Sequence, residues 1–199
     1  MKMLFCLLVI VISTSSFAEN TKISDENVPF LYEARADIKA PKHKLAKLIS
    51  SDYRNAKDEF TRHDLFQQID PVLDKRLTEA NKIKQVLLCI GGRLDNYDFD
   101  KKSFPTGFGP TTFIPFKNGY AVTFTNPENI QYISVPIESA KKLSNELRRS
   151  RKTVFNVYGE ITGTKEADLD WRTKKALQVK ITKIEAHLKS GTKIGVKTL

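Results

Sequence analysis

The sequence predicts an α+β protein, with N-terminal helices followed by a mainly antiparallel sheet, or a small partly open barrel, with one packed helix. Two segments, 153–163 and 177–188, alternate apolar and polar residues with the period of two that a half-buried strand requires. Three- and four-residue apolar spacing, typical of amphipathic helices, occurs before residue 82 and again in 137–150. Short connections between the later strands favour antiparallel pairing.

Residues 1–18 have the features of a signal peptide. A short positive start precedes an apolar run over residues 4–12, and Ser16-Phe17-Ala18 fits the small-x-small rule for cleavage after Ala18. The run is short for a membrane span, so an uncleaved anchor is the less favoured alternative. We therefore expect a periplasmic or secreted protein of one domain, with no transmembrane span once the signal peptide is cleaved.

Residues 19–41 are polar with scattered apolar positions and two prolines, which predicts a poorly ordered lead-in, with Phe30 to Tyr32 as a segment that could dock. A helical region follows over 42–82. Its long amphipathic pattern contains Pro71, which predicts a break into two helices with Asp70 as a cap.

A β-rich domain is expected over 83–199, with strands at 84–90, 120–124 and 131–135 before the helix at 137–150. The polar stretch 163–175 is interpreted as a long hairpin loop between the two clearest strands. A slip of the apolar phase near Thr182 and Lys183 indicates a β-bulge. Residues 192–199 are expected to be a short basic tail, and the Val-x-Gly-x-Ile pattern at 157–161 favours the barrel alternative of the OB type.

Cleavage after Ala18 would leave Cys89 as the single cysteine. It lies in the apolar run 86–90, which predicts a buried, inert thiol and excludes an intramolecular disulfide. The formal net charge is +10, or +9 without Lys2. Such a field would attract anionic lipids, wall polymers or extracellular DNA, although a merely soluble surface explains the charge equally well.

The chain has none of the common hydrolase or phosphate-loop motifs, and its histidines lack the spacing of metal ligands, so we predict neither a metal nor a cofactor. Two groups of carboxylates remain. Asp95 and Asp98 are candidates for an unusual hydrolase site, and an acidic loop with Glu166, Asp168 and Asp170 could contact calcium. That loop lacks the central glycine and distant glutamate of the known calcium loop, which favours a solvated acidic loop.

The main candidate site is a cluster of cations at the end of the 137–150 helix. Cations stabilise a helix C-terminus, which is a purely structural explanation; a docking patch for an acidic partner or a phosphate-bearing polymer is the functional one. Its residues are Lys141, Lys142, Arg148, Arg149, Arg151 and Lys152. A candidate aromatic surface beside it comprises Phe108, Tyr120, Tyr132 and Tyr158, which could act as stacking platforms. No recognition-helix motif is present, so sequence-specific nucleic-acid binding is not expected.

Several short motifs resemble a family of exported bacterial proteins, the domain of unknown function numbered 4852. The resemblance extends over about residues 45–188 and implies no activity and no functional residues. The motifs are Tyr53-Arg54-Asn55, Glu59-Phe60, Leu94-Asp95-Asn96-Tyr97-Asp98-Phe99 with Phe104, Val135-Pro136-Ile137-Glu138-Ser139-Ala140, and Tyr158-Gly159.

The leading hypothesis is an exported binding or structural accessory protein that uses a β surface and the basic helix end. Its expected partner is an envelope protein, an anionic polymer or a lipid surface. An envelope hydrolase with a carboxylate site is one alternative, and an inhibitor or immunity-type protein with an aromatic rim near residues 104–116 is another.

Overall fold

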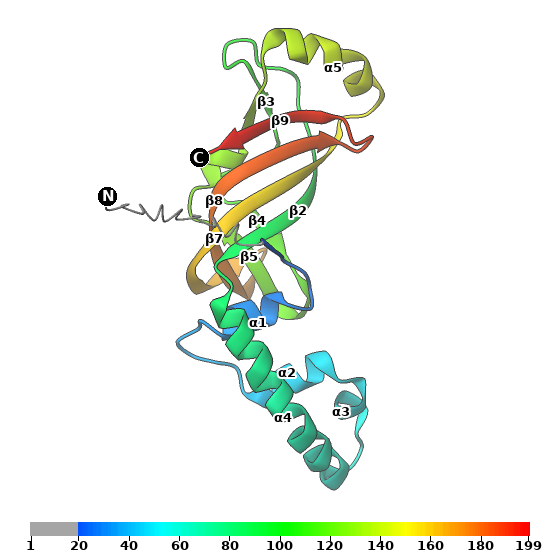
Figure 1. Cartoon of the computed structure of the whole chain (residues 1–199), viewed down its shortest axis with the longest axis vertical. Helices are drawn as coiled ribbons and strands as arrows, with labels where there is room; N and C mark the ends of the chain where they lie inside the picture. Colours follow the sequence, from blue (N-terminus) through cyan, green and yellow to red (C-terminus); the bar gives the residue numbers. More distant parts are fainter. Residues whose placement is uncertain (1–19) are drawn as a thin grey trace, which may run out of the picture.

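A computed structural model describes residues 20–199, and the predicted signal peptide lies outside these residues. The molecule is elongated, with a twisted sheet between two helical ends (Figure 1). One end contains α1 (Val28–Glu33), α2 (Lys42–Ile49), α3 (Ser51–Asn55) and α4 (Glu59–Lys82); the other carries α5 (Ile137–Arg149). This arrangement confirms the α+β class.

The large sheet has the strand order β1-β2-β7-β8-β5-β4, and β9 also pairs with β8. Pairing is antiparallel except between β1 and β2 and between β5 and β8. The sheet does not close into a barrel, so the barrel alternative is wrong. The strands are β1 (Thr21–Lys22), β2 (Gln85–Arg93), β4 (Phe113–Pro115), β5 (Tyr120–Phe124), β7 (Lys152–Leu169), β8 (Arg172–Leu188) and β9 (Lys193–Thr198), and a separate pair is formed by β3 (Ser103–Pro105) and β6 (Tyr132–Ser134).

The β7–β8 hairpin is the longest pair, and it confirms the predicted bulge. Tyr158 pairs with Lys183 while Gly159 pairs with Ile181, so Thr182 is the extra residue. Gly159 is required here, because a Cβ atom would lie 2.4 Å from Val179 Cγ1 and 2.8 Å from the Lys180 carbonyl oxygen.

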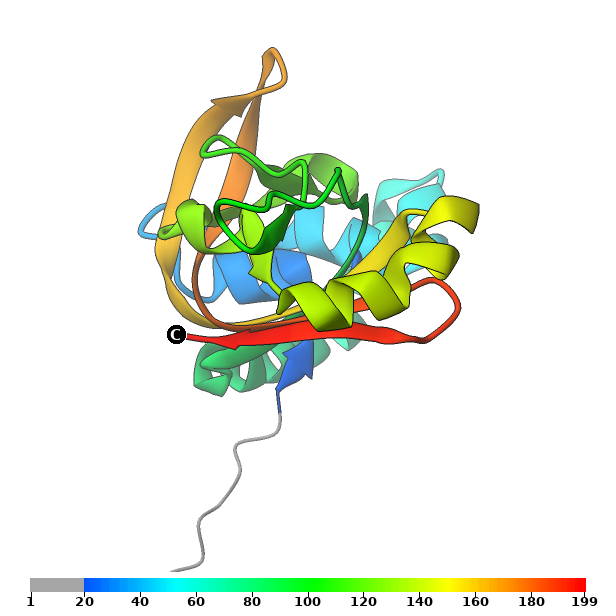
Figure 2. The same cartoon turned by 90° about the horizontal axis from the view of Figure 1, so that it is seen from above.

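The predicted long loop over 163–175 is wrong, because both strands continue through it. Only Asp170 and Trp171 connect them, both with positive φ (54° and 61°) as in a tight type I′ hairpin turn. The end of this hairpin extends beyond its neighbours (Figure 2), and Trp171 at the tip is fully exposed. Alternation is weak toward the tip because residues 170–173 are exposed on both faces, so apolar residues are not needed on either.

The structure also differs from the sequence expectation at both ends of the described chain. Instead of a poorly ordered lead-in, β1 adds to the edge of β2, and α1 buries Val28 and Leu31 completely. The expected basic tail forms β9, whose Ile194 is buried. Isolated apolar residues in these segments reach the core because the sheet edge supplies backbone hydrogen-bond partners that local sequence does not reveal.

The helix α4 is continuous through Pro71, so the predicted break is wrong. A proline inside a helix costs about 3 kcal/mol. Burial of Leu73 against the core offsets much of this cost. Lys42, whose Nζ lies 2.8 Å from Asp70 and 2.7 Å from Asp74, bridges the two sides of the proline, but these exposed ion pairs add at most about 1 kcal/mol. The start of the helix is capped by Asp58, whose carboxylate accepts a hydrogen bond from the Thr61 amide at 2.8 Å.

Arg35 holds the other end of α4. Its guanidinium donates to the carbonyl oxygens of Ala80 (3.0 Å), Asn81 (3.3 Å) and Ile83, and to Leu31 within its own segment (2.9 Å). Carbonyl groups at the end of a helix lack the full set of intrahelical partners, and a cation there is favourable; at Ala80 the guanidinium adds to a backbone hydrogen bond from the Ile83 amide at 3.3 Å. Burial lowers the pKa of Arg35 from its ordinary value.

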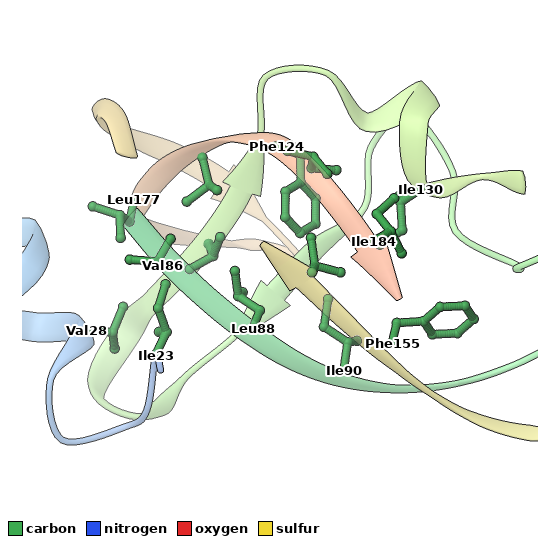
Figure 3. Close-up of a cluster of buried hydrophobic side chains, with 14 of the residues drawn as sticks. Ile23, Val28, Val86, Leu88, Ile90, Phe124, Ile130, Phe155, Leu177 and Ile184 are labelled. Atoms are coloured by element: carbon green, nitrogen blue, oxygen red, sulfur yellow. The ribbon is translucent and has the colours of Figure 1, made fainter. Parts of the chain in front are cut away.

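The main core lies between the sheet and the segments that cover it, where strand and helix residues interdigitate (Figure 3). In β2 the residues Val86, Leu88 and Ile90 point into this core. Cys89 therefore faces outward and is exposed, which makes the prediction of a buried thiol wrong. Residues 86–90 are all apolar, but only alternate side chains of a strand point to the same face. Cys89 lies between the inward-pointing Leu88 and Ile90, so its thiol points outward.

Candidate binding site

The helix α5 has one apolar face and one highly charged face. Pro136 precedes its first turn, where the lack of an N–H is tolerated, and Arg148 and Arg149 occupy its last turn. Ala140, Leu143 and Leu147 are buried on the inner face. The helix lies at the end of the molecule opposite α4 (Figure 1), and Figure 2 shows it beside β9.

A pocket of about 230 Å³ lies between α5 and the segment 97–104. Its apolar floor combines aromatic rings from that segment with aliphatic side chains of the helix. The lining residues are Tyr97, Phe99, Phe104, Ile137, Ala140, Lys141, Ser144, Leu147, Arg148 and Arg151. No lining residue is acidic.

The aromatic wall is held in place by Tyr97. Its hydroxyl donates to the carbonyl oxygen of Val135, two residues before the start of α5, at 2.6 Å. Its ring packs edge-on against Phe104, with the ring centres 4.9 Å apart, and against Phe99 at 5.2 Å. Phe104 is buried, whereas Phe99 is 69% exposed. The wall is thus anchored at Tyr97 and open to solvent at Phe99.

Three cations lie around the pocket, and they differ in how they are engaged. Lys141 pairs with Glu138 at 2.8 Å, and Arg151 donates to the Asp95 carbonyl oxygen at 2.7 Å. Within residues 20–199, Arg148 makes no side-chain hydrogen bond or ion pair. Its guanidinium is therefore available to an external carboxylate or phosphate.

The structure thus divides the six predicted basic residues into two groups. Lys141, Arg148 and Arg151 line the pocket, whereas Lys142, Arg149 and Lys152 are exposed and do not.

The predicted aromatic surface does not assemble at this pocket, and its four residues are engaged elsewhere. Tyr120 is only 5% exposed, which makes its assignment as a stacking platform wrong. Burial and its hydrogen bond to Glu33 raise the pKa of Tyr120. Phe108 packs edge-on against Phe155 at 5.3 Å, and the Tyr132 hydroxyl accepts from Lys101 Nζ at 2.7 Å.

Tyr158 is half-buried on the outer face of β7, in a small polar network. Its hydroxyl donates to Glu185 Oε2 at 3.1 Å, and Lys183 lies 2.7 Å from the Glu185 carboxylate and 4.4 Å from the centre of the Tyr158 ring. The hydrogen bond from Lys183 is the main reason that the pKa of Glu185 lies below its ordinary value. The Tyr158 hydroxyl and ring therefore already interact with Glu185 and Lys183 of the same chain.

The carboxylates considered for hydrolysis are arranged differently from a catalytic pair. The Asp98 carboxylate accepts from the amides of Asp100 (3.0 Å) and Lys101 (2.9 Å), which stabilises a turn, and Asp95 is exposed. Neither lines the pocket. Over residues 20–199, no group of His, Cys, Asp and Glu side chains could hold a metal ion, and no helix is long and apolar enough to cross a membrane.

Sequence reasoning missed the aromatic half of the pocket. Tyr97 and Phe99 alternate with aspartates in the sequence, but no strand forms there; the bridge between Asp98 and Ser103 and the hydrogen bond from Tyr97 to Val135 order the segment. Ser144 continues the spacing of Ala140 along the inner face of α5. A polar residue on an otherwise apolar helical face was the signal that this face is partly uncovered.

No curated protein and no solved structure matches the chain. A family model does match, over residues 45–146, and is described as "Domain of unknown function (DUF4852)". The match spans just over half of the chain and ends earlier than the resemblance predicted. It contains the pocket residues from Tyr97 to Ser144, and it excludes Leu147, Arg148 and Arg151. The chain therefore belongs to the DUF4852 family of domains of unknown function.

Proposed function

We propose that this protein is an exported binding or structural accessory protein of the bacterial envelope, which holds an anionic partner at the basic end of α5. The observation that carries the proposal is the pocket at α5, which combines an apolar floor with a rim of Lys141, Arg148 and Arg151 and has no acidic lining residue. Convergent polar groups at the edge of an apolar hollow are typical of binding sites.

The electrostatics favour an anion over a neutral or cationic ligand. Arg148 is exposed and without a partner in the described chain, so its charge is neutralised only by solvent and counterions. The net charge, +10 for the full chain and +9 without Lys2, would also increase the rate of encounter with anions at low ionic strength. Arginine offers paired N–H donors that match a carboxylate or a phosphate.

The β surface that we expected beside the basic helix end has less support. Tyr120 is buried, and Tyr132 and Tyr158 interact with lysines of the same chain. We therefore place the binding surface at α5 and its pocket rather than on the outer face of the sheet.

Retention of envelope components by the purified protein tests the proposal. A protein with Arg148→Glu and Arg149→Glu should lose retained anionic material, which the unmodified protein should release as the salt concentration rises. The matched control carries Lys57→Glu and Lys75→Glu, which change the net charge equally at exposed sites on the opposite helical end. Equal retention by both variants would refute a site at α5.

Export is tested separately. Cell fractionation should find the protein outside the cytoplasm, and N-terminal sequencing should begin at Glu19. A cytoplasmic protein that begins at Met1 would refute the envelope location.

A further inference from the structure

We infer that the pocket at α5 receives one bulky apolar side chain from an acidic segment of a partner protein. This inference rests on the proposed function and narrows it to one class of partner. It combines three properties of the pocket, namely its size, the chemistry of its floor and the position of its cations.

Size argues for a single side chain. Pockets that enclose a complete small ligand usually have volumes of about 300–1,000 Å³. The α5 pocket is smaller, at about 230 Å³, and it opens to solvent beside the exposed ring of Phe99. Protein interfaces commonly place one aromatic or aliphatic anchor into a hollow of this kind and cover the surroundings with weaker contacts.

The floor argues for an apolar anchor. Tyr97, Phe99 and Phe104 already pack edge to face, and an incoming ring can continue this arrangement against the exposed Phe99. Ile137 and Leu147 supply the opposite wall. A phosphate polymer or an acidic polysaccharide would satisfy the rim but has no aliphatic or aromatic side chain to cover these surfaces.

The position of the cations argues for acidic residues next to the anchor. Lys141, Arg148 and Arg151 lie at the pocket itself, so an anchor inserted there brings its chain neighbours to the rim. A membrane lipid fits less well, because its acyl chain would have to leave the bilayer for a hollow too small to hold a complete chain. An acidic peptide segment with one bulky apolar residue satisfies both halves of the site.

Two matched pairs of variants separate the pocket from the general basic surface. Arg148→Glu and Arg149→Glu make the same charge change at adjacent exposed residues, but only Arg148 lines the pocket. Ser144→Phe places a ring in the pocket, whereas Asn145→Phe places it on the exposed side of the same helix. Thermal melts establish that each variant folds.

The probes are fluorescein-labelled peptides of the sequence Glu-Asp-Glu-Xaa-Glu-Asp-Glu, with Phe, Leu or Ala at the central position, and fluorescence anisotropy measures their binding to the protein. The Phe and Leu peptides should bind roughly 10- to 100-fold more tightly than the Ala peptide, from the burial of one large apolar side chain. Ser144→Phe should abolish this difference and Asn145→Phe should preserve it. Arg148→Glu should weaken binding of the Phe peptide several-fold more than Arg149→Glu.

Equal binding of the three peptides would overturn the inference, as would no binding of any of them. An equal effect of Ser144→Phe and Asn145→Phe would also overturn it. Inorganic polyphosphate is the comparison probe. One outcome is that polyphosphate binds, that Arg148→Glu and Arg149→Glu weaken its binding equally, and that the three peptides bind equally. In that case the proposed anion-binding function stands and the apolar anchor is refuted. If the envelope retention experiment fails as well, the proposed function falls with it.

Discussion

The buried carboxylate of Glu33 should be essential for joining the N-terminal helices to the sheet. Glu33 is 1% exposed and accepts three hydrogen bonds from separate parts of the chain. Its Oε1 accepts from the Tyr120 hydroxyl at 2.8 Å and from Lys175 Nζ at 2.6 Å, and its Oε2 accepts from the Ala40 amide at 2.6 Å. Tyr120 and Lys175 belong to β5 and β8, so one side chain links α1 to two paired strands.

The Glu33→Ala substitution should destabilise the protein by about 2–4 kcal/mol, because the Ala40 amide and the Tyr120 hydroxyl lose their acceptor and Lys175 loses its ion pair. The Tyr120 hydroxyl would be left buried without an acceptor, which by itself costs about 1–3 kcal/mol. Lys175 is 28% exposed and can regain water, so it adds less. Glu33→Gln keeps an acceptor for Tyr120 but loses the charge and presents a donor toward the Ala40 amide; it should cost about 2 kcal/mol.

Urea unfolding followed by far-ultraviolet circular dichroism measures these free energies. Combining Glu33→Gln with Lys175→Met completes a double-mutant cycle, and we expect a coupling energy of about 1–2 kcal/mol between two residues in direct contact. A cost below about 1 kcal/mol for Glu33→Ala would refute the reasoning, because no buried charged network of this kind could then be holding α1.

Four further outcomes follow from single features. Arg35→Ala should lower the free energy of unfolding by about 3 kcal/mol, because several carbonyl oxygens at the end of α4 lose a charged donor; urea unfolding measures this. Gly159→Ala should cost about 1–3 kcal/mol because its Cβ would overlap the neighbouring strand, whereas Gly91→Ala, with open space around its Cβ, should be near neutral in the same assay. Cys89 should react with a thiol reagent in the native protein, and protection until unfolding would contradict its exposed position. Glu185, whose folded pKa is lowered, contributes stability above its ordinary pKa of 4.5 that is lost as the pH falls through the folded value; Glu185→Gln should therefore flatten the decline in stability below pH 4.5, and an unchanged acid profile would refute this.

Local patterns predicted those parts of the fold in which one face of an element is buried. The alternation in β7 and β8 identified both strands, and the slip of apolar phase located the bulge at Thr182, because a buried face forces apolar residues into register. The same reasoning failed at the end of the hairpin, where neither face is covered. It failed again at Pro71, where packing of Leu73 against the core, a tertiary contact that the local sequence does not reveal, offsets the local cost of the proline.

The candidate site was only half predictable for a related reason. The cations of α5 are visible as a cluster in the sequence, but the aromatic wall comes from residues some forty positions earlier, in a segment whose only strand is the three-residue β3. Its position depends on contacts between residues distant in the sequence, among them the hydrogen bond from Tyr97 to Val135, two residues before α5. Hydrophobic periodicity does not reveal such contacts. The sequence therefore predicted the charged surface of the site but not the apolar floor of its pocket.

The two ends of the molecule show why residue type alone does not assign function to a cation. Lys175 and Arg148 carry the same charge, but Lys175 is largely covered and its ammonium lies 2.6 Å from a fully buried carboxylate. That charge is already neutralised inside the protein and is not available to an external anion. Arg148 is exposed at the edge of an apolar pocket and has no partner within residues 20–199. An anion that binds there therefore displaces only water and counterions, which makes Arg148 rather than Lys175 the residue on which the binding proposal depends.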